Sequence, residues 1–332
     1  MPSSLPEISV VIPNWNGQHF LERCLTSIYN QKGEHAIEVI IADNNSTDTS
    51  KSYLAEHFPQ VLVVALTENK GFDGGVNAGI NAAKAPLIFL LNNDTELEPS
   101  CITSLIAAAK ANPKVGFFAT KMLDFKDHSI IDSCGDCLCW NGRSFNRGQL
   151  EKDTGQYNEE EFVFGACAGG AVYRRSLFDA IGIFDETFFA YLEDVDISFR
   201  AQLAGFTCKY IPGAQIFHIG SATAGKGSSF SFKMMVKNHF HLIYKNYSIT
   251  QLIKHLPKLA YAELRLQAAA YRQHYGKAYW WGVLTAAREW PQERSKRAKV
   301  QRDRKVSDEY LNQIILPNFT YKPLAQALKR KP

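Results

Sequence analysis

The run Ile-Ser-Val-Val-Ile at residues 8–12 is followed directly by a Pro-Asn pair, and this stretch decides the class of fold. A short β-branched run that ends in such a pair is typical of a buried strand leading into a loop. The run EVIIA at residues 38–42 predicts a second buried strand, and residues 61–66 and 86–91 predict a third and a fourth. Strands that are apolar throughout indicate a parallel sheet with both faces covered.

Helical patterns lie between these predicted strands. Residues 19–30 place five apolar side chains on one helical face, and residues 71–84 begin as a glycine-rich helix entrance. The segment DNNSTD at residues 43–48 predicts a helix capped by Asn45 or Ser46, with Asp48 in its first turn. Alternating strands and helices predict an α/β fold with a mostly parallel central sheet, and such sheets bind ligands at the carboxyl ends of their strands.

Polar residues gather at the carboxyl ends of three predicted strands. They are Asn14, Asn16, Asp43, Asn92, Asn93 and Asp94. Loops are often polar for conformational reasons alone, and Asn and Asp also cap helices. Because three loops on one edge of one sheet share the pattern, a ligand site at this edge is the stronger interpretation.

The segment ENKGFDGGVNAG at residues 68–79 indicates a nucleotide site of an unusual kind. Its four glycines allow close approach of a ligand to the backbone, and a helix N-terminus attracts phosphate. The segment lacks the GK[ST] of a Walker loop. It also differs from G-x-G-x-x-G, and it follows the third strand rather than the first, which argues against a dinucleotide site.

The motifs VVIPNWNG, IIADNNSTD, ENKGFDGGVNAG and FLLNNDTELEP, in this order and spacing, resemble those of the family 2 glycosyltransferases. The similarity is greatest to the bacterial rhamnosyltransferase-like branch, and it covers roughly residues 7–222, through FFAYLEDVDISFR and IPGAQIFHIGS. It implies the GT-A fold, with a Rossmann-like central sheet flanked by helices. It also implies an inverting, metal-dependent transfer of a sugar from a nucleoside-diphosphate-sugar to a hydroxyl of a glycan or lipid-linked acceptor in cell-surface polysaccharide synthesis.

The resemblance implies a divalent cation, Mg²⁺ or Mn²⁺, held by Asp94 and His218. Asp94 lies in the position of a D-x-D-like motif, but Asn92 replaces the first acidic residue and Glu96 follows. Hard cations prefer oxygen ligands and would bridge a donor diphosphate. The alternative for His218 is a half-buried side chain that bonds to backbone.

The resemblance also implies a set of donor contacts. Asp43 matches the residue that accepts a hydrogen bond from a pyrimidine N3–H, which UDP- and dTDP-sugars share. Asp43 could equally serve an Asx turn or a helix cap. The other implied contacts are Pro13, Asn14, Asn16, Asn69, Gly71, Asn77, Asn92, Asn93 and Gly170.

Three carboxylates at residues 193–196 supply the candidate base. Acceptor attack requires a group that takes the hydroxyl proton. By resemblance this is Asp194, with Glu193 as the second catalytic candidate; acids in the first turn of a helix also favour its dipole. Asp196 and Arg200 are spaced as an i,i+4 ion pair. A nucleotidyltransferase and a non-catalytic donor-binding homologue are the alternatives.

Cysteine usage favours a reducing compartment. The number of cysteines, seven, is odd in a long chain, which makes a disulfide scaffold improbable. Cys134, Cys137 and Cys139 suggest a zinc site, but a fourth ligand at a familiar spacing is lacking and His128 is the nearest candidate. We therefore expect these cysteines to be small apolar residues of a hairpin.

Charge divides the chain into two predicted parts, a catalytic domain at 1–225 and a basic, aromatic-rich helical extension at 226–332. Residues 1–225 contain 16 basic and 27 acidic side chains, and residues 226–332 contain 21 and 6. Hydrophobic residues form 45% of the chain and aromatic residues 12%, which excludes a disordered or fibrous protein.

The basic extension predicts contact with an anionic membrane surface. Seven of the twelve residues at 294–305 are basic and one is acidic. A solvated appendage is the alternative, and no nucleic-acid-binding signature supports a nucleic-acid partner.

Neither a signal peptide nor an apolar run long enough to span a bilayer is visible. We expect a cytoplasmic enzyme, peripheral on the inner face of the cell membrane, with a glycan or polyprenyl-diphosphate-linked acceptor.

Overall fold

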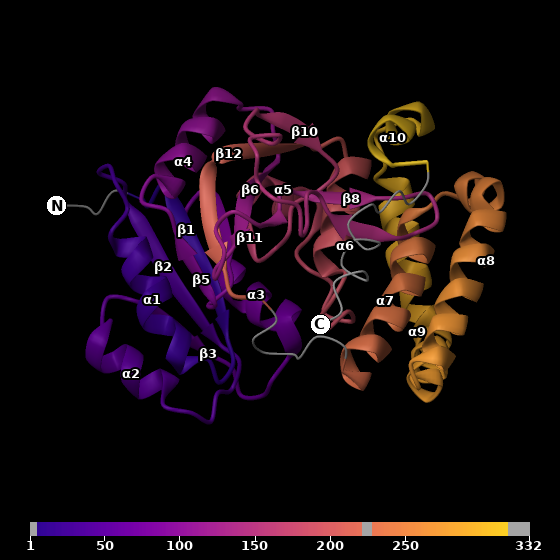
Figure 1. The fold of residues 1–332 in the computed structure, drawn as a ribbon, viewed down its shortest axis with the longest axis horizontal. Helices are drawn as coiled ribbons and strands as arrows, with labels where there is room; N and C mark the ends of the chain where they lie inside the picture. Colours follow the sequence, from indigo (N-terminus) through magenta and orange to yellow (C-terminus); the bar gives the residue numbers. More distant parts are fainter. Residues whose placement is uncertain (1–4, 221–227, 318–332) are drawn as a thin grey trace.

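The computed structural model describes residues 5–220 and 228–317, and a mixed sheet forms its centre. The strand order is β10-β12-β6-β11-β4-β1-β2-β3, while β5 pairs with β12 and β7 with β6 (Figure 1). Strands β4, β1, β2 and β3 are parallel neighbours, and β11 is antiparallel to both β4 and β6. The strands are β1 (Ile8–Asn14), β2 (Ile37–Asp43), β3 (Leu62–Ala65), β4 (Leu87–Leu91), β5 (Thr95–Leu97), β6 (Phe117–Asp124), β7 (Ile131–Ser133), β10 (Glu161–Val163), β11 (Gly170–Arg174) and β12 (Cys208–His218).

Helices cover both faces of this sheet because neighbouring strand residues point to opposite sides. Val10 and Ile12 of β1 share a core with α1, whereas Val11 shares a second core with Val76 and Ile80 of α3. The predicted α/β architecture and its four parallel strands are confirmed. These helices are α1 (Gln18–Tyr29), α2 (Ser50–His57), α3 (Gly71–Ala82), α4 (Cys101–Ala111), α5 (Arg175–Ile181) and α6 (Glu193–Leu203).

The predicted cap of the second helix is wrong. Helix α2 begins at Ser50, with Thr49 in the cap position, so Asp48 precedes the helix instead of lying in its first turn. Asp48 accepts hydrogen bonds from the backbone N–H groups of Ser50 and Gln18, at 3.0 and 3.1 Å. Asp48 thus links the start of α1 to the start of α2, and it does so from a position just before α2.

The cysteine-rich segment forms the expected hairpin, β8 (Asp136–Leu138) with β9 (Ser144–Asn146). Cys134 and Cys139 are buried. No cluster of three or more metal-ligating side chains occurs within residues 5–220 and 228–317, so the zinc alternative gains no support there.

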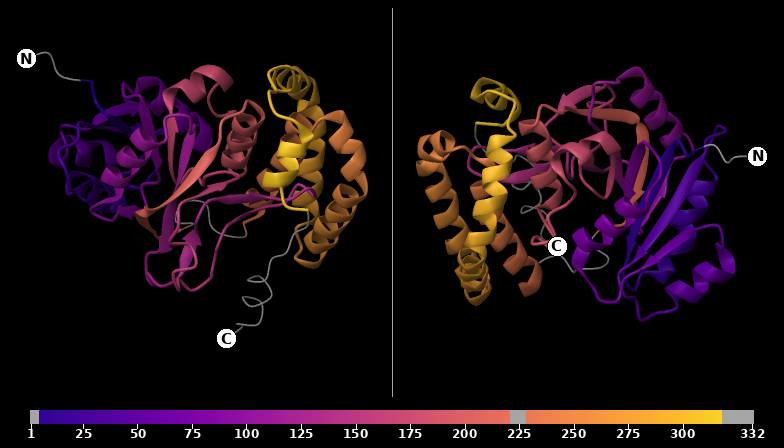
Figure 2. Two further views of the ribbon diagram at one scale, coloured as in Figure 1. Left: turned by 90° about the horizontal axis from the view of Figure 1, so that it is seen from above. Right: turned by 180° about the vertical axis from the view of Figure 1, so that it is seen from behind.

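The C-terminal helices pack as a bundle against the catalytic part of the chain. The bundle comprises α7 (Ser229–Asn246), α8 (Ile249–Arg272), α9 (Gly276–Arg302) and α10 (Asp308–Ile314). Figures 1 and 2 show these helices at the end of the molecule opposite α1 and α2. Phe188 and Phe199 of the catalytic part share one hydrophobic core with Leu242, Tyr247 and Leu311. The predicted boundary at 225/226 lies within residues 221–227, outside the described part of the chain.

Within the described residues, none of the helices combines the length and the apolar character that a membrane crossing requires.

Candidate active site

Asp43 ends strand β2 with one carboxylate oxygen that has no hydrogen-bond partner. The residue is fully buried, and its Oδ2 accepts a hydrogen bond from the Ser46 backbone N–H at 3.2 Å. Lys51 Nζ lies 3.9 Å from the same oxygen. Oδ1 has no hydrogen-bond partner. A buried acceptor without a donor is costly, so a ligand N–H at this point would be bound favourably.

The asparagines after β1 and β4 hold the neighbouring loops together. Asn14 donates to Ser50 Oγ at 3.1 Å and accepts from Asn93 Nδ2 at 2.8 Å, while Asn16 Oδ1 accepts from the Thr47 N–H at 2.8 Å. These bonds join the loops that follow three parallel strands. The structure therefore brings Pro13, Asn14, Asn16, Asp43 and Asn93 to one sheet edge, as predicted, and their contact with a donor stays a prediction.

Side-chain hydrogen bonds hold the segment that leads into α3. Asn69 Oδ1 accepts from the Gly71 N–H at 2.9 Å and from Asn44 Nδ2 at 3.0 Å. Gly71 has φ +71°, and a Cβ there would lie 2.2 Å from the Phe189 carbonyl oxygen, so glycine is required. The amide of Asn77 bonds to the backbone of Phe184, both as donor and as acceptor, at 3.0 Å each. Asn77 thus anchors the 184–186 loop, and a donor contact from it stays a prediction.

Asp94 and His218 meet at the predicted metal position. His218 Nε2 lies 3.3 Å from Asp94 Oδ1, and His218 Nδ1 lies 2.7 Å from Asp132 Oδ2. Nε2 is buried without a hydrogen-bond partner. Burial lowers the pKa of His218, but the adjacent carboxylates of Asp132 and Asp94 raise it to about 10. A carboxylate on the far nitrogen of a metal-binding imidazole fixes its tautomer, so these residues suit a cation held between Asp94 and His218.

Asn92 directly follows β4, and Gly170 begins the neighbouring strand β11. The Asn92 N–H donates to the Gly169 carbonyl at 3.0 Å, and Gly170 pairs with Leu91 across β11 and β4. A Cβ at Gly170 would lie 2.5 Å from Ile216 Cδ1, so a larger residue here would displace the Ile216 side chain of β12. The position of both residues fits the predicted donor site.

Glu193 and Asp194 open helix α6 in a poorly solvated carboxylate cluster. Asp194 Oδ1 accepts from the Val195 N–H at 2.8 Å, and the pKa of Asp194 is raised by burial. Burial and the adjacent Asp194 charge raise the pKa of Glu193 well above its usual range. Glu193 Oε2 has no hydrogen-bond partner. The two carboxyl groups are coupled, and the role of Asp194 as the base stays a prediction.

Three carboxylates near the site, of which Asp73 and Asp136 are buried and Asp132 is partly exposed, carry no motif signal in the sequence. Asp132 supports His218, and Asp136 is buried with its Oδ2 unpartnered and its pKa raised well above the usual range by burial and by Asp194. Asp73 is fully buried with neither oxygen bonded, and burial raises its pKa well above the usual range. Asp73 resembles an ordinary first-turn acid in the sequence, and Asp132 and Asp136 are isolated residues of short strands.

The loop before Asp194, the predicted base, is strained. Phe189, Tyr191 and Leu192 have φ values of +66°, +72° and +67°, a region that L-residues other than Gly, Asn and Asp seldom adopt. Each such residue costs roughly 1–3 kcal/mol unless its surroundings hold it in place. The expected ion pair between Asp196 and Arg200 is confirmed at 2.8 Å and fixes α6 directly after this loop.

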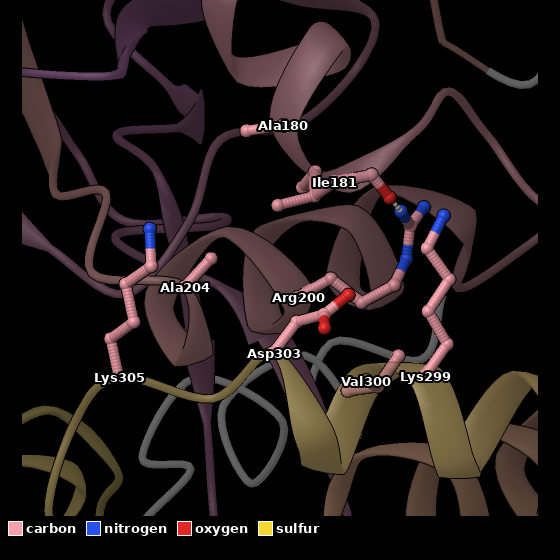
Figure 3. A pocket seen from close by; sticks show the side chains of 8 residues that line it. All are labelled: Ala180, Ile181, Arg200, Ala204, Lys299, Val300, Asp303 and Lys305. Carbon is pink, nitrogen blue, oxygen red and sulfur yellow. Dashed lines mark hydrogen bonds between the residues drawn. The ribbon is translucent and has the colours of Figure 1, made fainter.

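A cavity of about 230 Å³ lies elsewhere, between α5, α6 and the end of α9. Figure 3 shows Arg200, Lys299, Asp303 and Lys305 around it. The Arg200 guanidinium is already bonded to Asp196 and to the Ile181 carbonyl oxygen. None of the predicted site residues lines this cavity, so it is separate from the candidate active site.

The solved structures place this architecture among the GT-A transferases. The fold is similar to that of GalNAc-T7 with UDP, GalNAc and Mn²⁺, with a TM-score of 0.63 and 14% identity over 87% of this chain and 58% of that one. It is also similar to the mannosyltransferase PcManGT from Pyrobaculum calidifontis in complex with GDP-Man and Mn²⁺, with a TM-score of 0.52 and 18% identity over 91% and 87%.

The chain belongs to glycosyl transferase family 2, whose family model matches residues 9–182. It is 28% identical over 256 residues to the N-acetylglucosaminyl-diphospho-decaprenol L-rhamnosyltransferase of Mycobacterium tuberculosis, covering 68% of this chain and 79% of the relative. It is 25% identical over 227 residues to the GalNAc(5)-diNAcBac-PP-undecaprenol beta-1,3-glucosyltransferase of Campylobacter jejuni, covering 67% and 68%. The predicted family and class of enzyme, a glycosyltransferase, are confirmed, and the nucleotidyltransferase alternative is set aside.

Proposed function

We propose that this glycosyltransferase moves a sugar, with inversion, from a UDP- or dTDP-linked donor to a hydroxyl of a polyprenyl-diphosphate-linked glycan. The observation that carries the proposal is the Asp94–His218 pair, which leaves a buried imidazole nitrogen facing a carboxylate at the end of β4. The names of both relatives refer to lipid-diphosphate-linked saccharides, which supports the class of acceptor.

Asp94 and His218 would hold the divalent cation, Mg²⁺ or Mn²⁺, with Asp132 fixing the imidazole. Such a cation supplies charge that stabilises a departing nucleoside diphosphate. Asp43 would bind the pyrimidine N3–H through its unpartnered Oδ1. The N3–H is common to uracil and thymine, so Asp43 accepts either base.

Asp194 would take the proton from the acceptor hydroxyl. That oxygen bonds to the anomeric carbon while the bond from this carbon to the donor phosphate oxygen breaks. The nucleoside diphosphate leaves with the electron pair, and the proton resides on Asp194. One displacement of this kind inverts the anomeric centre without a covalent sugar–enzyme intermediate.

The test is a transfer assay with a panel of UDP- and dTDP-sugars, a short-chain polyprenyl-diphosphate-glycan and Mn²⁺. We expect transfer by the wild type, loss of Mn²⁺-dependent donor binding in D94A, and loss of transfer with retained donor binding in D194N. Donor and Mn²⁺ binding by D94A at wild-type strength would refute the metal assignment. Absence of transfer with every donor would favour the non-catalytic homologue.

The outer surface of α8 suits the anionic face of a membrane. One face of this helix, the α8 apolar face, is more than half exposed and comprises Ile249, Ile253, Leu256, Leu264 and Tyr271. Their spacing of near-whole turns aligns them along the helix. Trp280 of α9 extends the face by donating to Tyr271 Oη at 2.9 Å.

A basic row runs beside the α8 apolar face. It comprises Lys254, Lys258, Arg265 and Arg272, all exposed. An apolar strip with adjacent cations is typical of helices that lie in a lipid interface, where each Lys or Arg near the surface contributes about 1 kcal/mol. We therefore place the enzyme at the cytoplasmic face of the membrane, peripherally bound through α8.

Vesicle co-sedimentation tests this placement. We expect the wild type to bind phosphatidylglycerol-containing vesicles and to lose this binding in an Ile253→Asp, Leu264→Asp variant. Leu150→Asp is the matched control, because Leu150 is also more than half exposed but lies outside the bundle. Equal recovery with neutral and anionic vesicles would refute the electrostatic contribution, and unchanged binding by the α8 variant would refute the face.

A further inference from the structure

The backbone carbonyls of the strained loop before Asp194 have hydrogen-bond donors from other elements. Asn238 Nδ2 donates to the carbonyl oxygens of Phe188, Ala190 and Tyr191, at 3.0, 2.8 and 2.7 Å. Lys237 Nζ donates to the Thr187 carbonyl. The Phe72 N–H donates to the Phe189 carbonyl at 2.7 Å. Adjacent residues of α7 therefore hold four of the five carbonyls from 187 to 191.

The Asn238 side chain bonds to these carbonyl oxygens from a fully buried position. The residue is fully buried, and its side-chain oxygen has no hydrogen-bond partner, so the three carbonyls alone orient the amide. An amide nitrogen has two hydrogens, so one of them is shared between two acceptors. Without these bonds, carbonyls in a buried, strained loop would lack partners, and the loop would relax toward ordinary φ values.

We propose that Asn238 is a positioning residue for the catalytic base, acting through the 188–192 loop to hold Asp194 against the acceptor hydroxyl. The loop ends at Leu192, where helix α6 begins, and the Leu192 carbonyl accepts from the Asp196 N–H at 2.9 Å. A change in the loop would thus move the first turn of α6. The proposal rests on the role of Asp194 under the proposed function, and it makes α7 a part of the catalytic apparatus.

Asn238→Ala and Asn238→Asp test this role in the full-length enzyme. Asp has the volume of Asn but, when ionised, donates no hydrogen bond and repels the carbonyls. We expect either change to lower kcat for transfer about 10- to 100-fold, because displacing a reacting group by about 1 Å has that effect. We expect the affinity for UDP with Mn²⁺, measured by calorimetry, to stay within about twofold, since the Phe189 carbonyl beside Gly71 is held by the Phe72 N–H and not by Asn238.

Asn246→Ala is the matched control. Asn246 is also a fully buried asparagine of α7 whose side-chain oxygen lacks a partner, but its Nδ2 donates to Asp196 Oδ1 and to the Leu242 carbonyl instead of the loop. We expect Asn246→Ala to lower the melting temperature as much as Asn238→Ala while kcat stays within about threefold of the wild type. Equal loss of kcat in both variants would overturn the proposal.

A double variant separates positioning from a general structural effect. If Asn238 acts through Asp194, then D194N with Asn238→Ala has no lower kcat than D194N alone; independent effects would multiply. Multiplied losses would overturn the proposal, and so would a fully active Asn238→Ala. The proposed function fails separately, by wild-type transfer in D194N itself.

Discussion

Replacement of Asp43 by Asn tests how the enzyme selects the nucleobase of its donor. In the wild type, Oδ2 accepts from the Ser46 N–H and Oδ1 has no partner, so Oδ1 is the atom that we propose accepts the pyrimidine N3–H. An amide offers one oxygen and one NH₂ group, so D43N must place a donor against one of these two N–H groups. A hydrogen bond to a charged group contributes about 1.5–3 kcal/mol, which corresponds to an affinity loss of roughly 10- to 150-fold.

Calorimetric titration with UDP, dTDP and CDP in the presence of Mn²⁺ measures this effect. We expect D43N to lose affinity for UDP and dTDP, and to lose less for CDP, because cytosine presents an acceptor at N3. D48N is the control, since Asp48 fixes the same loops through backbone N–H groups of Gln18 and Ser50. Its UDP-to-CDP preference should match the wild type. Wild-type affinity of D43N for UDP would refute the proposed contact between Asp43 and the nucleobase.

Three further outcomes follow from the site. D132N should weaken Mn²⁺-dependent UDP binding about 10- to 100-fold, as loss of a carboxylate behind a metal-binding histidine does; unchanged binding in a Mn²⁺ titration would contradict this. D194N should lower kcat about 10²- to 10⁴-fold, whereas E193Q should retain most transfer because Asp194 is the proposed base; equal losses in kinetic assays would contradict the assignment. Burial raises the pKa of Asp185, but the ammonium groups of Lys245 and Lys296 outweigh burial and hold this pKa well below its usual range. The ionised Asp185 carboxylate therefore stabilises the fold above the unfolded-state pKa of about 3.9, and this stabilisation is lost as the pH falls from there through the lower folded-state pKa. Denaturant unfolding should therefore show a stability gap between wild type and D185N that is constant above about pH 5 and narrows steadily as the pH falls below about 4; a gap that stays constant across this range would contradict the linkage.

Local patterns in the sequence predicted the order of strands and helices in the first hundred residues. The apolar runs at β1, β2 and β4 leave no alternative to buried strands, because each is bounded by a polar loop. The start of α2 was mispredicted because Asp48 bonds to Gln18, which is 30 residues away in sequence. A cap that depends on such a tertiary contact has no local signal.

The site could be predicted only where its residues belong to motifs. Asp43, Asp94, Asp194 and His218 lie in recognisable segments, and the structure places them at the sheet edge or at the start of α6. Asn238 lies instead in a helix with no motif, and its role depends on carbonyl oxygens 47–50 residues away. The charge shift near residue 225 describes surface composition, which does not reveal that Leu242 and Tyr247 pack against the catalytic part.

The contact between Leu316 and the β8 hairpin bears on how the protein is made. The Leu316 N–H donates to the Leu138 carbonyl at 2.8 Å, and its own carbonyl accepts from the Trp140 N–H at 3.0 Å. On a ribosome, β1 to β4 can pair early, but these bonds must wait until Leu316 has emerged. Closure of the hairpin against this segment is therefore a later step of folding than the pairing of β1 to β4, because it joins residues far apart in the chain.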